Sequence, residues 1–94
     1  MMSFTIEKQN DDVFTVTVSE KTTTTHRVTV TDAALHELTS GHVSKVSLLE
    51  FSFNFLLDKE PNTAILSSFD INVISKYFND YKGAVRNWSN ENED

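Results

Sequence analysis

The sequence contains no cysteine, one proline and two glycines among its 94 residues. Without cysteine the chain forms no disulfide bond and has no thiolate chemistry, which fits a cytoplasmic protein. Two glycines are too few to build the phosphate-cradling loop of a nucleotide-binding protein. The first residues do not form a signal peptide, and no apolar run approaches the roughly 20 residues of a membrane span. We therefore expect a cytoplasmic protein that needs no cofactor and contacts no membrane.

Positive charge is also scarce in this chain. Eight Lys and Arg side chains stand against 14 Asp and Glu side chains, which gives a net charge of −6. The basic residues are scattered singly, whereas nucleic acid binding needs clustered basic side chains, so we expect no nucleic acid partner. Acidic residues gather at the C-terminus, as Glu91, Glu93 and Asp94. We interpret residues 87–94 as a disordered acidic tail and residues 1–86 as a single α+β domain.

Alternation of polar and apolar residues in the first third of the chain is typical of strands with one buried face. Phe14, Val16 and Val18 share one face of such a strand, and Thr15 and Thr17 share the other. The same pattern recurs on either side, with polar turn residues between. We expect a three-stranded antiparallel meander formed by residues 3–9, 13–19 and 24–30.

Capping residues predict two short helices. Either Thr31 or Asp32 is suited to begin a helix of residues 33–39, and Gly41 is suited to end it in the left-handed conformation. Asp70 is suited to begin a last helix, residues 71–82, which Gly83 would end. The predicted apolar stripe of this last helix is Ile71, Ile74, Tyr77, Phe78 and Tyr81. A short turn is expected over residues 62–69.

Residues 47–57 form the densest apolar segment, and their pattern fits either a strand or a helix. Phe51, Phe53 and Phe55 alternate with polar residues, which favours a strand. A serine cap at Ser44 or Ser47 and the helix-breaking Pro61 favour a helix, and eleven residues would be long for a strand. We therefore predict a helix.

As a helix, this segment has two opposed apolar stripes. Leu48, Phe51 and Phe55 lie on one stripe, roughly opposite the other. The other stripe consists of Val46, Leu49, Phe53, Leu56 and Leu57. A helix that is apolar on two sides has to be covered on both. One stripe packs on the sheet, and the second is covered either by the last helix or by a second protomer.

Residues 52–61, SFNFLLDKEP, are followed by Ile65-Leu66 and Phe69-Asp70, and then by Tyr77-Phe78. This pattern resembles a family of short uncharacterised bacterial proteins that share an S-F-x-F-L-L-x-x-E-P core followed by I-L-x-x-F-D. The resemblance covers residues 44–81. The chain departs from the family at Lys59, where arginine is expected, and at Asn79, where proline is expected. The resemblance implies a shape and no chemistry.

No catalytic or metal-binding constellation stands out in the sequence. The histidines, His26, His36 and His42, lack the i,i+4 spacing of a metal site and are interpreted as ordinary surface or edge residues. No serine lies in a nucleophile-elbow setting. The best candidate site is a partner surface that combines the second stripe with the charged helix end and the single tryptophan. Its residues are Leu48, Phe51, Phe55, Lys59, Glu60 and Trp88.

These observations predict an α+β fold, with a three-stranded antiparallel meander followed by two or three helices on one face. The function that fits best is a small non-enzymatic protein-interaction domain, acting through a protein partner or as a homodimer. The alternative is a regulatory or inhibitor-like chain, similar to an antitoxin, whose acidic tail binds a basic protein. A third hypothesis is a small enzyme or metal protein that uses the histidines.

Overall fold

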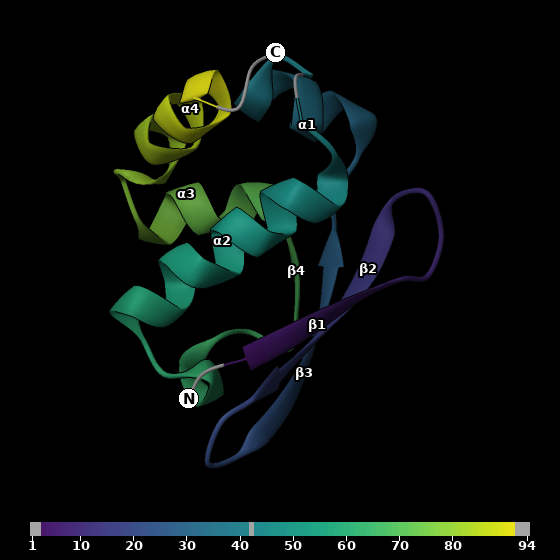
Figure 1. The fold of residues 1–94 in the computed structure, drawn as a ribbon, viewed down its shortest axis with the longest axis vertical. Helices are drawn as coiled ribbons and strands as arrows, with labels where there is room; N and C mark the ends of the chain where they lie inside the picture. Colours follow the sequence, from purple (N-terminus) through teal and green to yellow (C-terminus); the bar gives the residue numbers. More distant parts are fainter. Residues whose placement is uncertain (1–2, 42, 92–94) are drawn as a thin grey trace.

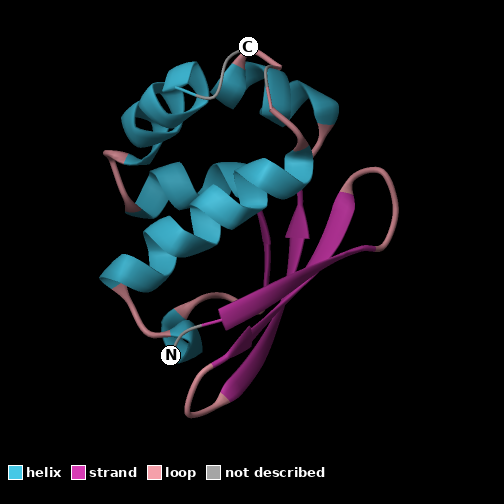
Figure 2. Cartoon of the chain, viewed as in Figure 1, coloured by secondary structure: helices cyan, strands magenta, loops and turns pink. Residues whose placement is uncertain are grey.

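A computed structural model describes residues 3–41 and 43–91, in which one sheet packs against helices on one of its faces (Figures 1 and 2). The predicted α+β class is confirmed. The strands are β1 (Ser3–Lys8), β2 (Val13–Ser19), β3 (Thr23–Thr29) and β4 (Ser68–Asp70). The α-helices are α1 (Asp32–Thr39), α2 (Lys45–Lys59), α3 (Ile74–Tyr77) and α4 (Tyr81–Glu91), with 3-10 turns η1 (Asn62–Ala64) and η2 (Ile71–Val73).

The sheet has four strands, in the order β1-β2-β3-β4, and not three as predicted. The first three form the expected antiparallel meander. β4 pairs parallel with β3, with Val28 opposite Phe69, so the sheet is mixed. Sequence patterning missed β4 because three residues are too few to show alternation. The pairing is supplied by the free edge of β3.

The apolar face of the sheet forms half of the core. Phe14, Val16 and Val18 of β2 are buried, together with Val28 of β3. They face the helices, while the threonines between them lie on the opposite side. On α2, Leu49, Phe53 and Leu56 are buried as predicted. The alternating and helical patterns therefore identified the two main partners in the core.

Side-chain caps set the starts of α1 and α2. The Thr31 hydroxyl accepts a hydrogen bond from the N–H of Ala34 at 3.1 Å. The Ser44 hydroxyl accepts one from the N–H of Ser47 at 3.1 Å. Each cap satisfies an N–H group that the helix itself leaves free. The helix ends in the left-handed conformation at Ser40, with φ of 60°, and the predicted Gly41 follows with a positive φ of 80°.

Lys45, the first residue of α2, joins three elements. Its ammonium group donates to the carbonyl of Asp11 at 2.6 Å, and lies 3.2 Å from the Asp12 carboxylate and 2.8 Å from that of Asp32. The hydrogen bond and charge of Lys45 lower the pKa of Asp32. This contact ties the β1–β2 turn and the start of α1 to the start of α2.

The C-terminal third differs from the prediction of one helix over residues 71–82. Asp70 caps η2 as expected, and η2 continues into α3. The backbone then becomes extended at Phe78, with φ of −129° and ψ of 102°, and a new helix begins at Tyr81. Gly83 lies inside this helix rather than ending one. The break reorients the chain, so that Tyr81 is buried against α2 rather than continuing the stripe of α3.

The predicted disordered tail is wrong for residues 87–91, which are helical in α4. Val85 and Ser89 of this helix are buried, and Trp88 is half-buried. These packing contacts come from a distant part of the chain, which composition could not reveal. Residues 92–94, the rest of the predicted tail, lie outside the described residues.

A buried hydrogen bond joins α2 to α4. Ser52 is fully buried, and its hydroxyl donates to the carbonyl of Leu48 at 2.7 Å. The hydroxyls of Ser52 and Tyr81 lie 2.6 Å apart. Because Ser52 has one hydroxyl proton, Tyr81 is the donor in this second bond. Burial raises the pKa of the Tyr81 phenol.

We expect Ser52→Ala to reduce the free energy of unfolding by about 1–3 kcal/mol, because it leaves the buried Tyr81 hydroxyl without an acceptor. Tyr81→Phe removes the donor itself and should cost less, about 0.5–1.5 kcal/mol. The double variant should recover part of the Ser52→Ala loss. Urea denaturation measures all three, and equal losses for the two single variants would contradict the assignment.

Stability should also fall at alkaline pH because of Tyr81. Its pKa is raised in the folded chain, so its contribution is present below the ordinary tyrosine value of about 10 and is lost as the pH rises above it. Denaturation from pH 8 to 11, compared between the wild type and Tyr81→Phe, isolates this contribution. An identical pH dependence for both proteins would contradict it.

Candidate binding cavity

The second stripe of α2 is covered largely by the same chain. Leu48 is fully buried. The ring of Phe51 stacks on that of Trp88, with centroids 4.8 Å apart and planes inclined by 21°. Phe55 meets the edge of Tyr81 at 5.3 Å. Four of the predicted partner residues are therefore core or interface residues between α2 and α4: Leu48, Phe51, Phe55 and Trp88.

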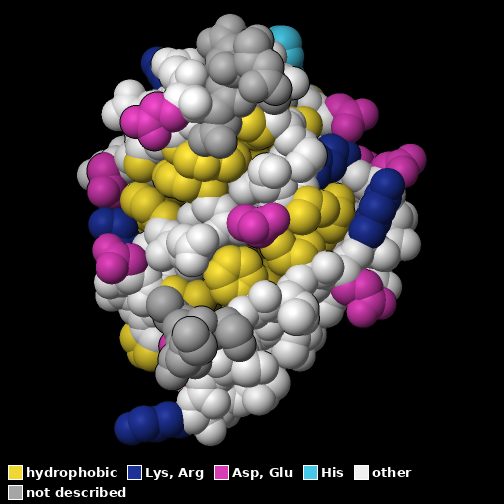
Figure 3. Space-filling model, viewed as in Figure 1, with side chains coloured by type: hydrophobic (Ala, Val, Ile, Leu, Met, Phe, Trp, Pro, Cys, Tyr) yellow, Lys and Arg dark blue, Asp and Glu magenta, His cyan; other side chains and the backbone are white. Residues whose placement is uncertain are grey.

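Some apolar surface persists on this side of the molecule. Figure 3 shows two groups of hydrophobic side chains separated by an acidic side chain. Phe51, Phe55 and Trp88 are half-buried, and each has a packing partner within the chain. The second stripe of α2 is therefore partly exposed, but its side chains pack against other residues of the same chain.

Lys59 and Glu60, adjacent in sequence and grouped in the predicted surface, point to different surroundings. The Lys59 ammonium lies 3.3 Å from the Asp80 carboxylate and 4.6 Å from the centroid of the Phe55 ring. Lys59 therefore links the end of α2 to the start of α4. Glu60 lies at the C-terminal end of α2, where its backbone is extended before Pro61, and lines a cavity.

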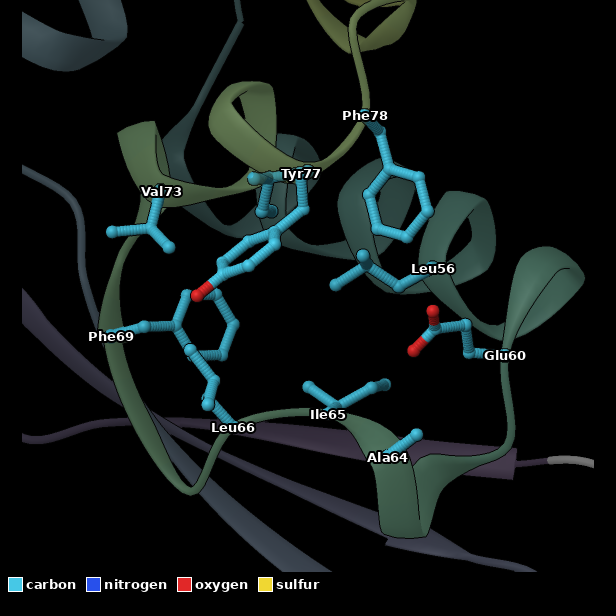
Figure 4. A pocket seen from close by; sticks show the side chains of 10 residues that line it. Leu56, Glu60, Ala64, Ile65, Leu66, Phe69, Val73, Tyr77 and Phe78 are labelled. Carbon is cyan, nitrogen blue, oxygen red and sulfur yellow. The ribbon is translucent and has the colours of Figure 1, made fainter.

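This cavity has a volume of about 270 Å³ and lies between the end of α2, the segment from η1 to β4, and α3 (Figure 4). In the described part of the chain, its lining comes from the continuous segment 56–78, which loops around it. The lining residues are Leu56, Glu60, Ala64, Ile65, Leu66, Phe69, Val73, Ile74, Tyr77 and Phe78. Nearly all are apolar, so the cavity suits an apolar guest.

The lip of the cavity exposes two large apolar side chains. Leu66 is 48% exposed and Tyr77 is 69% exposed. Within residues 3–41 and 43–91, the one other exposed large hydrophobic side chain is Val46, at 39%. Figure 4 shows the Tyr77 ring reaching across from α3 towards Leu66 and Phe69.

Among the described residues, Glu60 supplies the single charge in the lining. Figure 4 shows its carboxylate directed towards the cavity. In the part of the chain that the structure describes, no hydrogen bond or ion pair involves this carboxylate. The cavity therefore combines an apolar interior with one uncompensated negative charge at its mouth.

Buried His26 holds the loop that forms the cavity floor. Its Nδ1 lies 2.8 Å from the carbonyl of Leu66, and its Nε2 lies 2.8 Å from the Thr24 hydroxyl. The amide of Asn62 donates to Thr24 Oγ1 at 2.9 Å and to the Thr22 carbonyl at 2.8 Å. A carbonyl only accepts, so Nδ1 carries the proton and Nε2 accepts from Thr24. This network fastens the segment from η1 to β4 onto β3.

The interpretation of the histidines as surface or edge residues is wrong for His26, which is 2% exposed. His36 is exposed on α1, and His42 lies outside the described residues. Among residues 3–41 and 43–91, no three His, Cys, Asp or Glu side chains are placed to hold a metal ion. In the same residues, no helix is long and apolar enough to cross a membrane.

Sequence reasoning identified Glu60 but missed the cavity that it borders. Ile65, Leu66 and Phe69 were assigned to a turn, and Tyr77 to a core stripe. One signal was available: Leu66 and Tyr77 are large apolar residues in short segments, which have little capacity to bury them. The volume that they surround depends on how α2, η1, β4, η2 and α3 meet.

Comparisons with family models, with curated proteins and with solved structures found no match to this chain.

We expect His26→Leu to lower the free energy of unfolding by about 1–3 kcal/mol, because it leaves polar groups at Thr24 and Leu66 without their partner. Amide hydrogen exchange should accelerate specifically over residues 62–68. His36→Leu is a matched control on exposed α1 and should change stability by about 0.5 kcal/mol or less. Unchanged exchange over residues 62–68 in the His26 variant would contradict this role.

Proposed function

We propose that this chain is a small non-enzymatic protein-interaction domain whose contact site is the cavity at the end of α2. The observation that carries the proposal is the apolar lip, where Leu66 is 48% exposed and Tyr77 is 69% exposed beside an apolar hollow. Exposed apolar surface around a concave site is a common mark of a binding site.

The size of the cavity supports a side chain as its guest. Pockets that enclose drug-sized ligands measure about 300–1,000 Å³, and this one measures about 270 Å³. A large side chain inserted here would bury the lining and part of the lip. Burial of apolar surface contributes about 25 cal/mol per Å², and a few buried anchor side chains commonly carry most of the binding free energy.

A homodimer has less support than the sequence suggested. Its motivation was the second stripe of α2, but Phe51 packs on Trp88 of α4, and Phe55 packs on Phe78 and Tyr81. Light scattering at micromolar concentration tests the dimer, and a clean monomer would exclude it at that concentration.

The regulatory alternative rested on an acidic tail after Trp88, of which residues 89–91 are helical.

The proposed kinship with a family of short bacterial proteins rests on residues some of which line the cavity. Leu56, Glu60 and Phe69 belong both to the shared pattern and to the lining. The same is true of Ile65 and Leu66. If the kinship holds, the shared pattern describes the walls of this cavity as well as the helix that leads to it.

Filling the cavity should abolish partner binding without unfolding the chain. Ala64 is exposed and lines the cavity, so Ala64→Trp places an indole where the guest would lie. Ala33→Trp, at an exposed position on α1, is the matched control. Pull-down from the native host with quantitative mass spectrometry should show a protein retained by the wild type and the Ala33 variant and lost by the Ala64 variant.

Thermal denaturation checks that both variants remain folded. The proposal fails if every protein captured by the wild type is captured equally by Ala64→Trp. It also fails if the Ala33 control loses the same proteins, because the effect would then not depend on the cavity.

A further inference from the structure

We infer that the cavity recognises a peptide segment in which a large apolar side chain stands next to a lysine or arginine. The apolar side chain enters the cavity, and the basic residue pairs with Glu60. This inference rests on the proposed function and specifies the chemistry of the partner.

The first reason is the uncompensated charge of Glu60. No other charged side chain lines the cavity, and among the described residues no ion pair involves the Glu60 carboxylate. Its neighbour Lys59 does not neutralise it, because the Lys59 ammonium is held by Asp80 at 3.3 Å. A cation beside the mouth is therefore attracted, and an anion is repelled.

The aromatic walls favour the same sign of charge. Phe69 and Tyr77 present ring faces and edges around the cavity (Figure 4). The face of an aromatic ring attracts a cation, and guanidinium groups also stack on it. The chain as a whole has a net charge of −6, which favours the approach of a basic segment.

The shape of the site favours a peptide over a small free ligand. The hollow measures about 270 Å³, which is room enough for one large side chain. Leu66 and Tyr77 line the hollow and are also largely exposed at its lip. A peptide that crosses the lip covers both of these side chains while it inserts its anchor.

Selection from a displayed library of random peptides against the full chain tests the inference. We expect the selected peptides to combine Phe, Trp, Leu or Met with an adjacent Lys or Arg. Glu60→Gln should weaken these peptides by about two- to fivefold, as expected for an exposed ion pair. Selection against Glu60→Lys should instead enrich Asp or Glu beside the same apolar anchor.

Glu50→Lys is the matched control, since it makes the same charge change at an exposed position on α2 outside the cavity lining. It should leave the basic preference unchanged. The Ala64→Trp variant should select none of these peptides. A thermal melt of each variant separates loss of binding from loss of folding, and the conservative Gln variant keeps the test decisive if the Lys variant unfolds.

Two failures are distinguishable. If no selected peptide depends on the cavity, as judged by Ala64→Trp, the proposed function fails and this inference fails with it. If the peptides depend on the cavity but show no basic preference, or keep it in Glu60→Lys, only this inference is overturned. Phenethylamine that binds as tightly as the best peptide would also overturn it, because the guest would then be a small amine.

Discussion

The position of α4 depends on the buried hydrogen bond between Tyr81 and Ser52. α2 is apolar on two sides, and such a helix is stable only when both are covered. The sheet covers one side of α2. The backbone is extended at Phe78, between α3 and α4, and this places Tyr81 against α2, so that α4 covers the other side. With Trp88 stacked on Phe51, the same chain supplies the cover that a second protomer could have supplied. The exposed apolar side chains Leu66 and Tyr77 lie instead around the cavity at the far end of α2.

The far end of α2 is shaped by the path of the chain that follows it. After Pro61 it crosses to the open edge of β3, pairs there as β4, and returns through η2 and α3. These short elements, together with η1 and the end of α2, enclose a space that they do not fill, and this space is the cavity. His26 and Asn62 fasten this route to β3, so the site lies on a segment held by a rigid sheet. Binding residues on loops held by a scaffold are common among proteins.

Some elements were predictable because their signals are local. The alternation around Val16 identified β2, and Ser44 with Pro61 bounded α2 despite its three alternating phenylalanines. The misses had non-local causes. β4 exists because β3 has a free edge, α4 begins where Ser52 accepts a bond from Tyr81, and residues 87–91 are helical where packing on α1 and α2 supports them. Glu60 was identified as a charged helix end, but its relation to Leu66 and Tyr77 could not be read from spacing.

By itself the sequence determined the α+β class, the antiparallel meander and the two-sided helix, because side-chain periodicity and capping act over a few residues. It also determined the acidic balance and the absence of thiol chemistry. Only the tertiary structure decided which surface is closed and which is open. That decision depends on contacts between residues tens of positions apart, such as Ser52 with Tyr81 and His26 with Leu66, and no local pattern records them.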